Sequence, residues 1–422
     1  MEGLDIKEIS GDLIKTTLQQ VVEQRLGSKD VKIWIEAGSK KGDHFIGEIY
    51  RIIYQLGNDT NQSSLILKIA AQSVMRREKF RLASFFVREI RVYNETLPIF
   101  YEFQLSKGIT PQVDGFNEYA QCYSIIQKEL SESLFLEDLR VNQFEMLDHR
   151  KEDLTFEHVA LVMKALSKLH AISFALRDQQ PETFAKVTSN LDELYYRTDN
   201  VDFTIFLTAM GNRAINALNE RNLMELKNKF ARAIEKGFDK TGAECVTGKL
   251  AEPYTVLCHG DVWINNSMFK KDAQGKPIAV KLFDWQFSRY ASPVTDIILF
   301  LLSCTRKSLR DQHYDELIKI YYESLSNFLQ RLGSDPNKLF PYEALLDQLK
   351  QFGKYGTLTG IILIAIFSAD PDSIPDLSEF SERVDENEGE MNDLIKVPEE
   401  NLEDFTTRIC DLIEDSARFG YL

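Results

Sequence analysis

The spacing of hydrophobic and polar positions changes once along the chain, near residue 139. Before that point, four short runs rich in β-branched and aromatic residues predict strands. They are Phe45–Gln55, Ser64–Ala70, Tyr119–Gln127 and Leu134–Glu137. The turn-forming residues 57–62 separate the first two runs and predict a hairpin. Residues 78–97 repeat apolar side chains every three or four positions, which predicts one helix.

Beyond Leu139 the helical spacing dominates to the C-terminus. The first helix there has an apolar face at three- and four-residue spacing, made by Val159, Val162, Leu166, Leu169 and Ser173. Thr155 is placed to cap it, and a β segment at 254–284 interrupts the helical part. We therefore expect an α+β protein with two lobes: residues 1–138 form a small antiparallel-sheet lobe with one helix, and residues 139–422 a large, mainly helical lobe.

The composition limits the classes of partner. Of the 422 residues, 44% are hydrophobic and 27% are charged, which is typical of a soluble globular protein. The formal net charge of −15 disfavours a nucleic-acid-binding surface and adhesion to anionic membranes, because both would reward Lys and Arg. Nucleic acid and membranes are therefore not expected as partners, and the sequence makes no protein partner evident.

The sequence also predicts a cytoplasmic location. Its five cysteines are scattered without CxxC spacing, as is typical of free thiols in a reducing compartment. Residues 1–15 mix acidic and basic groups, so no signal peptide is expected. The apolar stretches Ile297–Cys304 and Leu358–Ala369 are shorter than the roughly 20 residues of a membrane-spanning helix. The acidic run 371–402 is interpreted as a solvated insertion.

Two polar side chains flank a predicted hairpin within the β segment. Asn266 precedes its first strand, Asp284 follows its second, and the turn is centred on Gly275. An antiparallel hairpin would place Asn266 opposite Asp284 with Cβ atoms about 5 Å apart, so that the two could share a hard cation such as Mg²⁺. Asp261, on the preceding loop, adds a carboxylate that can accept a hydroxyl proton. Each residue alone is more often a turn cap, but together they predict a phosphoryl-transfer site.

These motifs resemble a known superfamily. The strings HGDVWINN, residues 259–266, and DWQ, residues 284–286, are similar to the aminoglycoside phosphotransferase and choline kinase superfamily. The longer strings LCHGDVWINNSMF and FDWQFSRYASPVTDIILFL resemble the ecdysteroid kinase-like family. The resemblance extends over most of the chain, from about Gly38 to Tyr421.

The resemblance implies a protein-kinase-like fold and an activity that depends on ATP and Mg²⁺. The expected reaction is phosphorylation of a hydroxyl on a steroid or another small molecule. By the same resemblance, Asp261 is the catalytic base, whereas Asn266 and Asp284 hold the magnesium ion. His259 would support the loop, and Asp296 would tie down the backbone of that loop.

Two misplaced charges predict the nucleotide side of the site. Lys68 shares a strand face with apolar Ile66 and Ala70, where a lysine is rare unless it is paired or bound to an anion. Glu89 lies on the apolar stripe of the predicted helix 78–97. We predict an ion pair between them, which in kinases holds the lysine against the phosphates. The alternative for Glu89 is an edge residue of an amphipathic helix.

Further nucleotide contacts are expected from backbone groups. The loop from Gly38 through Gly42 to Gly47 could cover the phosphates, although it matches no standard phosphate-loop pattern. The connector residues Glu137 and Leu139 would meet adenine through their backbone.

The same motifs bear on three other classes of protein. A protein kinase is disfavoured because HGD replaces HRD, DWQ replaces DFG and no Ala-Pro-Glu follows. A metal-dependent phosphohydrolase would leave Lys68 and Glu89 unexplained. Its two metals would be held by His259, Asp261, Asp284 and Asp296. A catalytically weak pseudokinase that binds a hydrophobic ligand stays open, although every expected catalytic side chain is present.

The sequence does not identify the acceptor beyond a small hydroxylated molecule. Its pocket would be built from the helical lobe, including Leu194–Tyr196, Phe203–Phe206 and helices beyond residue 300. The apolar and aromatic content there favours a steroid or lipophilic alcohol over a polycationic drug. Trp263 is interpreted as packing that could touch substrate, and His170 as a hydrogen-bonded helix residue.

Overall fold

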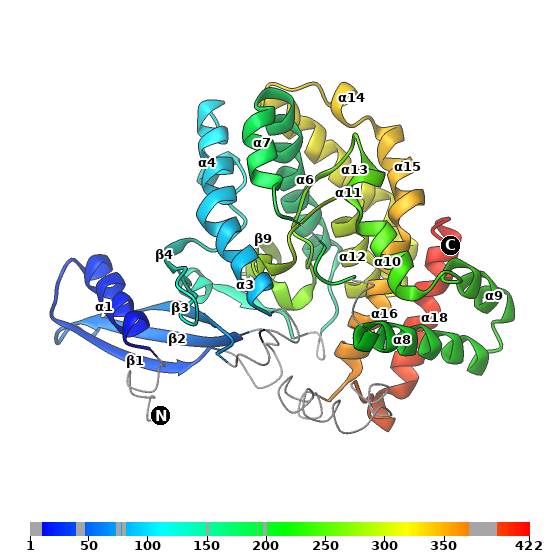
Figure 1. Ribbon diagram of the computed structural model, residues 1–422, viewed down its shortest axis with the longest axis horizontal. Helices are drawn as coiled ribbons and strands as arrows, with labels where there is room; N and C mark the ends of the chain where they lie inside the picture. The colour runs from blue at the N-terminus through cyan, green and yellow to red at the C-terminus, as the bar shows by residue number, and fades with distance from the viewer. Residues whose placement is uncertain are drawn as a thin grey trace.

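A five-stranded antiparallel sheet forms one end of the molecule, at the left of Figure 1. The structure is a computed structural model and describes residues 11–38, 47–72, 77, 82–148, 152–191, 193–196, 201–370 and 395–422. The strands follow the order β1-β2-β3-β5-β4. Their bounds are β1 Val31–Ala37, β2 Gly47–Leu56, β3 Gln62–Ala70, β4 Cys122–Ile126 and β5 Ser133–Glu137. All four predicted strands and the β2–β3 hairpin are confirmed, and β1 adds a fifth strand.

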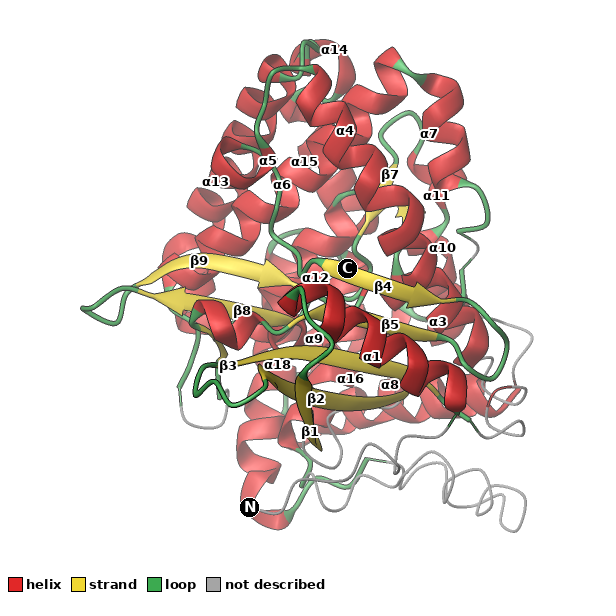
Figure 2. Ribbon diagram, turned by 90° about the vertical axis from the view of Figure 1, so that its left-hand side faces the viewer, coloured by secondary structure: helices red, strands yellow, loops and turns green. Residues whose placement is uncertain are grey.

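Helix α1, Asp12–Leu26, packs on the sheet and was not predicted (Figure 2). Its side chains Ile14 and Leu18 are buried in a cluster with Ile35 and Ile52 of the strands. Burying this narrow apolar stripe stabilises a helix whose remaining positions are mostly polar. The prediction of one helix within residues 1–138 is therefore wrong, because α1 is a second helix there.

A second helical stretch lies between the sheet and the rest of the protein. It consists of α3 Leu82–Arg91, a π-helical turn Val92–Thr96 and α4 Leu97–Ser106. This stretch confirms the helix predicted at 78–97, extends it at its C-terminal end, and leaves residues 78–81 outside the described part. Phe86 and Ile90 are buried in the main core, which also contains Ala70 and Leu134 of the sheet. The stretch therefore connects the sheet to the helical core.

The remainder of the chain is mainly helical. The described helices are α5 Pro111–Asp114, α6 Phe156–Gln179, α7 Pro181–Thr188, α8 Val201–Glu220, α9 Met224–Ala233, α10 Phe238–Val246, α11 Gly248–Ala251, α12 Val294–Cys304, α13 Lys307–Arg331, α14 Pro336–Leu339, α15 Tyr342–Phe352, α16 Lys354–Ser368 and α18 Leu402–Arg418. Two small sheets join β6 Phe144–Met146, β8 Ser267–Lys271 and β9 Pro277–Leu282, and β7 Val256–Cys258 with β10 Arg289–Ala291. The α+β class and the two-lobed arrangement are thus confirmed. The boundary between residues 138 and 139 stays a prediction.

Helix α6 forms the centre of the helical part and contacts α7, α12, α13, β7 and β9. A capping box forms at its start, where Thr155 Oγ1 lies 3.0 Å from His158 Nδ1, so the predicted cap is confirmed. Among the described residues, α6 is the one helix long and apolar enough to cross a membrane, and 83% of its apolar window is buried inside the protein. Packing of the helix on several sides accounts for this hydrophobicity.

A buried carboxylate attaches the C-terminal helix α18 to α13. Asp415 is completely buried and accepts hydrogen bonds from Arg310 Nε at 2.6 Å and Lys307 Nζ at 2.9 Å. Arg418 Nη2 donates to the same carboxylate at 2.7 Å. Because Arg310 is also buried, its charge depends on Asp415 for compensation.

We expect Asp415→Asn to lower the free energy of unfolding by about 3 kcal/mol, because it leaves the buried guanidinium of Arg310 without a counter-charge. The measurement is urea unfolding followed by far-UV circular dichroism. Asp114→Asn is the matched control, since its partner Arg331 is exposed, and that change should stay within about 1 kcal/mol. Equal losses in the two variants would contradict this account of Asp415.

Candidate active site

The loop that carries Asp261 is held by a carboxylate from α12. The backbone amides of His259 and Gly260 donate to Asp296 at 2.7 and 2.9 Å. Gly260 has φ +85°, and a Cβ atom there would lie 1.9 Å from the carbonyl oxygen of Phe287, so only glycine fits. Asp296 therefore ties down the loop backbone, in the manner that the resemblance implied.

Asp296 belongs to a buried polar cluster with His170. Its Oδ2 lies 3.2 Å from His170 Nε2, and His170 Nδ1 lies 2.9 Å from the hydroxyl of Tyr321. Burial raises the pKa of Asp296, but hydrogen bonds from His170 and the loop amides outweigh it and keep that pKa below its ordinary value. Cys258 lies close enough for a three-residue metal site by ligand type. All three side chains already bond to protein groups, so the cluster is a structural support.

His259 supports the loop through a hydrogen bond to its backbone. It is completely buried, its Nδ1 accepts a hydrogen bond from the amide of Asp261 at 3.3 Å, and its ring centroid lies 4.4 Å from that of Trp285. Burial lowers the pKa of His259 and favours the neutral imidazole that can accept this bond. The geometry fits a positioning residue, since the ring acts on the backbone of Asp261.

The register of the β8–β9 hairpin corrects one prediction. Ser267 pairs with Leu282, and the amide of Phe283 donates to the carbonyl of Asn266 at 3.1 Å. Asn266 is therefore opposite Phe283 and not opposite Asp284. The turn is centred on Gln274 and not on Gly275, because the amide of Asp272 donates to the carbonyl of Lys276. A bulge beside Lys271 then shifts the register by one residue toward the predicted pairing without reaching it. Asp284 lies beyond the strand in the left-handed conformation, with φ 69°.

Asn266 and Asp261 are nevertheless in direct contact. The Nδ2 of Asn266 donates to Asp261 Oδ2 at 2.8 Å and to the carbonyl of Asp261 at 2.9 Å. Burial, followed by the charge of Asp284, raises the pKa of Asp261 to about 7. A carboxylate with a pKa near neutral pH is well suited to accept a proton.

Lys68 contacts two carboxylates at once. Its Nζ lies 2.6 Å from Glu89 Oε2 and 3.0 Å from Asp284 Oδ1. The Lys68–Glu89 ion pair predicted from the sequence is confirmed, and the contact with Asp284 was not foreseen. Burial would lower the pKa of Lys68, but the two carboxylates reverse the effect and raise it. The contacts join β3, α3 and the end of the hairpin at one point.

When Glu89 and Asp284 are both ionised, they and Lys68 carry one surplus negative charge. Two carboxylates share a single ammonium, and burial raises the pKa of Glu89 to about 7 despite the nearby Lys68. A divalent cation would compensate this charge. The oxygen atoms of Asp284 and Asn266 are the hard ligands that Mg²⁺ prefers. The Nδ2 of Asn266 is engaged by Asp261, which assigns its amide oxygen to the cation side. The residues present therefore fit a magnesium ion.

For the other residues predicted to bind the nucleotide, the structure shows only contacts within the protein. Gly47 begins β2, where a Cβ atom would lie 2.4 Å from the carbonyl of Ile69, so its small size serves strand pairing. Gly42 lies outside the described residues. The carboxylate of Glu137 accepts from Gln121 N at 3.1 Å, and Leu139 is buried. Adenine contacts through the backbone of Glu137 and Leu139 stay a prediction.

The sequence analysis missed a residue at this connector. Asp138 is buried and accepts hydrogen bonds from Ser64 Oγ at 2.6 Å and from Arg51 Nε and Arg140 Nε at 2.9 and 2.8 Å. It ties the connector to β2 and β3. An acidic residue directly after an apolar strand was the available signal.

A second residue missed was Arg289 on β10. It is 3% exposed, and its Nη2 donates to the carbonyl of Gly260 at 3.2 Å. A charge within a short strand that pairs with buried β7 is the same kind of signal that identified Lys68.

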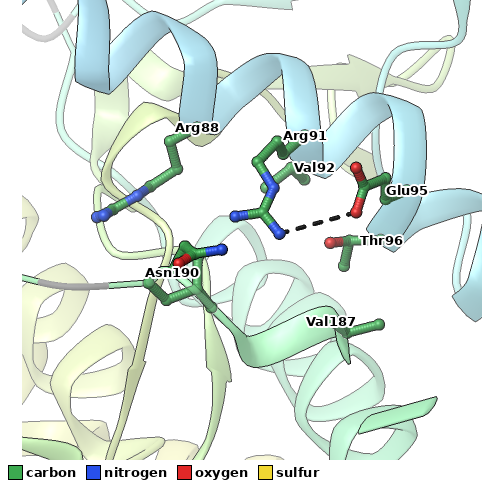
Figure 3. Close-up of a pocket in the computed structure, with 8 residues that line it drawn as sticks. Arg88, Arg91, Val92, Glu95, Thr96, Val187 and Asn190 are labelled. Atoms are coloured by element: carbon green, nitrogen blue, oxygen red, sulfur yellow. Dashed lines mark ion pairs between the residues drawn. The ribbon is translucent and has the colours of Figure 1, made fainter. Parts of the chain in front are cut away.

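A small recess lies between the C-terminal end of α3, with the π-helical turn that follows it, and residues 187–191 (Figure 3). Arg91 crosses it, with Nη2 3.8 Å from Glu95 Oε2 and Nη1 donating to the carbonyl of Ser189 at 3.1 Å. The recess is closed by Val187 and Asn190. None of the predicted site residues lines it, so it is separate from the Lys68–Asp261 group.

Comparison with known proteins gives one family match. The model of the ecdysteroid kinase-like family matches residues 41–334. No curated protein matches the sequence.

Two solved structures share features of the fold. A Plasmodium vivax ethanolamine kinase is 12% identical, with a TM-score of 0.38 over 92% of this chain and 82% of that chain. A GDP complex of an aminoglycoside 2'-phosphotransferase-IIIa mutant is 12% identical, with a TM-score of 0.42 over 89% of this chain and 99% of that chain. Because both TM-scores are below 0.5, nothing about activity follows from these two likenesses.

Lys68→Met should weaken binding of an ATP analogue, and Glu89→Gln should weaken it less, because Lys68 would remain but be less well oriented. Isothermal titration calorimetry of the two single variants and the double variant measures both effects. We expect the double variant to bind no more weakly than Lys68→Met, since the two residues act as a unit. Effects that simply add would contradict the pairing.

Asp284→Asn should lower the pKa of Asp261 from about 7 in the magnesium-free protein, because it removes a nearby negative charge. Asp261 would then be ionised over more of the range below pH 7. Carbon-13 NMR of labelled aspartate carboxyls, recorded from pH 4 to 8, follows the titration, and Asp261→Asn assigns the signal. An unchanged midpoint would show that the charge of Asp284 does not reach Asp261.

Proposed function

Since this chain belongs to the ecdysteroid kinase-like family, we propose that it transfers the γ-phosphoryl group of ATP to a hydroxyl of a steroid or another lipophilic alcohol. The acceptor is a small molecule, and the reaction takes place in the cytoplasm. The five cysteines, all free thiols, support that location.

One observation carries this proposal: two contacting sets of residues meet at the end of the β8–β9 hairpin. Lys68, Glu89 and Asp284 form the first set, Asn266 and Asp261 form the second, and the amide of Phe283, the residue before Asp284, donates to the carbonyl of Asn266. Lys68 bridges Glu89 and Asp284 at 2.6 and 3.0 Å, and Asn266 contacts Asp261 at 2.8 Å. Such a group has a cation for phosphate oxygens, oxygen ligands for a metal and a carboxylate for a hydroxyl proton.

Each residue has a separate task in the proposed reaction. Lys68, oriented by Glu89, would contact the phosphates of ATP. Asn266 and Asp284 would hold Mg²⁺, which when bound neutralises phosphate charge. Asp261 would accept the proton from the attacking hydroxyl, and the Nδ2 of Asn266 fixes the orientation of its carboxylate. Preorganised groups of this kind lower the barrier by positioning and charge stabilisation.

The geometry also separates this proposal from a metal-dependent phosphohydrolase. That alternative needs Asp296 and His259 as metal ligands. Asp296 instead accepts from two loop amides and contacts His170, and His259 accepts from the amide of Asp261. The carboxylate of Asp296 and the Nδ1 of His259 are thus occupied in holding the loop.

We expect Asp261→Asn to reduce turnover by roughly 10²- to 10⁴-fold, the usual contribution of a positioned base. Because the amide keeps the shape of the carboxylate, affinity for an ATP analogue with Mg²⁺ should stay near that of the wild type. The experiment combines calorimetry of the analogue with ADP release, measured with and without a panel of hydroxylated acceptors, and mass spectrometry of the added phosphate.

Three results would contradict the proposal. Unchanged turnover in Asp261→Asn would remove its role as the base. Loss of metal binding together with activity would support a hydrolase. Nucleotide binding without acceptor-dependent ADP release by the wild type, over the whole panel, would support a pseudokinase.

A further inference from the structure

A buried arginine is fixed beside the proposed base. Arg289 is 3% exposed; its Nη2 donates to the carbonyl of Gly260 at 3.2 Å, and its Nε donates to the carbonyl of Phe287 at 3.2 Å. Gly260 directly precedes Asp261 in the chain. The guanidinium therefore lies one peptide group away from the residue that would accept the hydroxyl proton.

The remaining nitrogen of this guanidinium lacks a full complement of partners. Nη1 is 3.3 Å from Glu193 Oε2 in an ion pair, but among the described residues no acceptor lies in hydrogen-bonding geometry to it. A buried donor of this kind costs free energy unless an acceptor meets it. The same holds for Trp263 Nε1, two positions after Asp261, within the described part of the chain. The Nη1 of Arg289, on a guanidinium that is fixed to the residue before Asp261, can thus donate to a ligand.

Glu193 links Arg289 to an aromatic surface. Its Oε1 accepts from the backbone amides of Tyr195 and Tyr196 at 2.7 and 2.9 Å. The ring centroid of Tyr195 lies 4.7 Å from that of Phe203 and 5.7 Å from that of Phe287. We call Tyr195, Phe203 and Phe287 the aromatic wall. The carboxylate of Glu193 therefore contacts both the backbone of Tyr195, which belongs to the wall, and the guanidinium of Arg289.

The wall and the proposed base lie close together. A Cβ atom at Gly260, the residue before Asp261, would lie 1.9 Å from the carbonyl oxygen of Phe287, which belongs to the wall. Arg289 lies over the ring of Tyr355, 5.4 Å from its centroid. Tyr195 is only half-buried, so part of its surface is open to a ligand.

We propose that the aromatic wall and Arg289 form the surface that selects the acceptor. The wall would pack against a flat apolar ring system, and Nη1 of Arg289 would donate a hydrogen bond to a second oxygen of the same molecule, while its reacting hydroxyl faces Asp261. Glu193 is the positioning residue. An ammonium group has no lone pair, so an acceptor that carries one at this point cannot accept the hydrogen bond from Nη1 of Arg289. This inference rests on the proposed function and names its substrate class: neutral ring alcohols with a second oxygen.

The test measures binding without turnover. The probes are naphthalene-2,6-dimethanol, which has two oxygens on a flat ring, 2-naphthalenemethanol, which lacks the second, and 6-(aminomethyl)-2-naphthalenemethanol, which replaces it with an ammonium. Each is titrated by fluorescence with Mg²⁺ and a non-hydrolysable ATP analogue present. We expect the wild type to bind the diol about tenfold more tightly than the mono-alcohol, the usual effect of one hydrogen bond to a charged donor, and to bind the ammonium compound most weakly.

The variants assign this binding to residues. Tyr195→Ser should weaken the diol about tenfold through loss of the ring contacts, and Tyr195→Phe should recover most of the loss. Glu193→Gln should weaken the diol while affinity for the ATP analogue stays unchanged. Tyr101→Ser is the matched control and should have no effect, because it removes an aromatic ring on α4 whose exposed hydroxyl hydrogen-bonds with Gln112. Arg289→Lys should abolish the preference for the second oxygen.

The outcomes separate this inference from the proposed function. Binding of the diol that depends on Tyr195, without phosphate transfer from ATP, would overturn the function and leave the surface in place. Phosphate transfer with an acceptor KM that does not change in Tyr195→Ser would overturn the surface and leave the function. Absence of any preference between the diol and the mono-alcohol in the wild type would exclude the hydrogen bond from Arg289, even if Arg289→Lys does not fold. Failure of the wild type to bind any of the three probes would overturn the whole inference.

Discussion

Lys68 is the point on which the two parts of the structure depend. Its ammonium is shared between Glu89 on α3 and Asp284 at the end of the β8–β9 hairpin, which is 216 residues away in the chain. Removing three charged groups from water is costly, and the cost is offset only when their geometry is good. The sheet, α3 and the hairpin must therefore be packed in fixed relative positions for this contact to exist. The surplus negative charge that remains is the feature that a magnesium ion would complement.

The loop of Asp261 is also held by contacts from distant segments, in this case between side chains and backbone groups. The strand that leads into it, β7, has only three residues and pairs only with β10. The amides beyond its end need other partners, since buried backbone groups are costly when unpaired. Asp296 supplies acceptors for the amides of His259 and Gly260, and Arg289 supplies a donor for the carbonyl of Gly260. Side chains from two later elements thus fix a loop that its own strand cannot fix.

Helix α3 lies between the nucleotide side and the proposed acceptor side. Glu89 faces Lys68, whereas Arg91 on the same helix donates to the carbonyl of Ser189, a few residues before Glu193 and Tyr195. Phe85 of α3 also packs on Phe287 of the aromatic wall, with ring centroids 4.8 Å apart. One rigid element therefore contacts groups on both sides of the site.

The sequence by itself determined the elements whose signals are local. The β-rich run 64–70, the turn residues 57–62 and the apolar stripe of α6 predict a strand, a hairpin and a helix, because each of these patterns lies within one short stretch of the sequence. The pairing of Lys68 with Glu89 was also predictable, since a charge on an apolar face requires a partner. The approximate position of the hairpin near Asn266 followed from its turn.

Only the tertiary structure decided what depends on contacts between distant segments. The residues that pair in the β8–β9 hairpin depend on the exact centre of the turn, at Gln274, and on the bulge beside Lys271. Counting from the turn sequence fixes neither. Lys68 contacts Asp284, and Arg289 contacts Glu193, although these residues are far apart in the sequence. No periodic pattern in the sequence indicates that they meet. Such contacts are selected by desolvation and packing of the whole fold, which no local pattern reports.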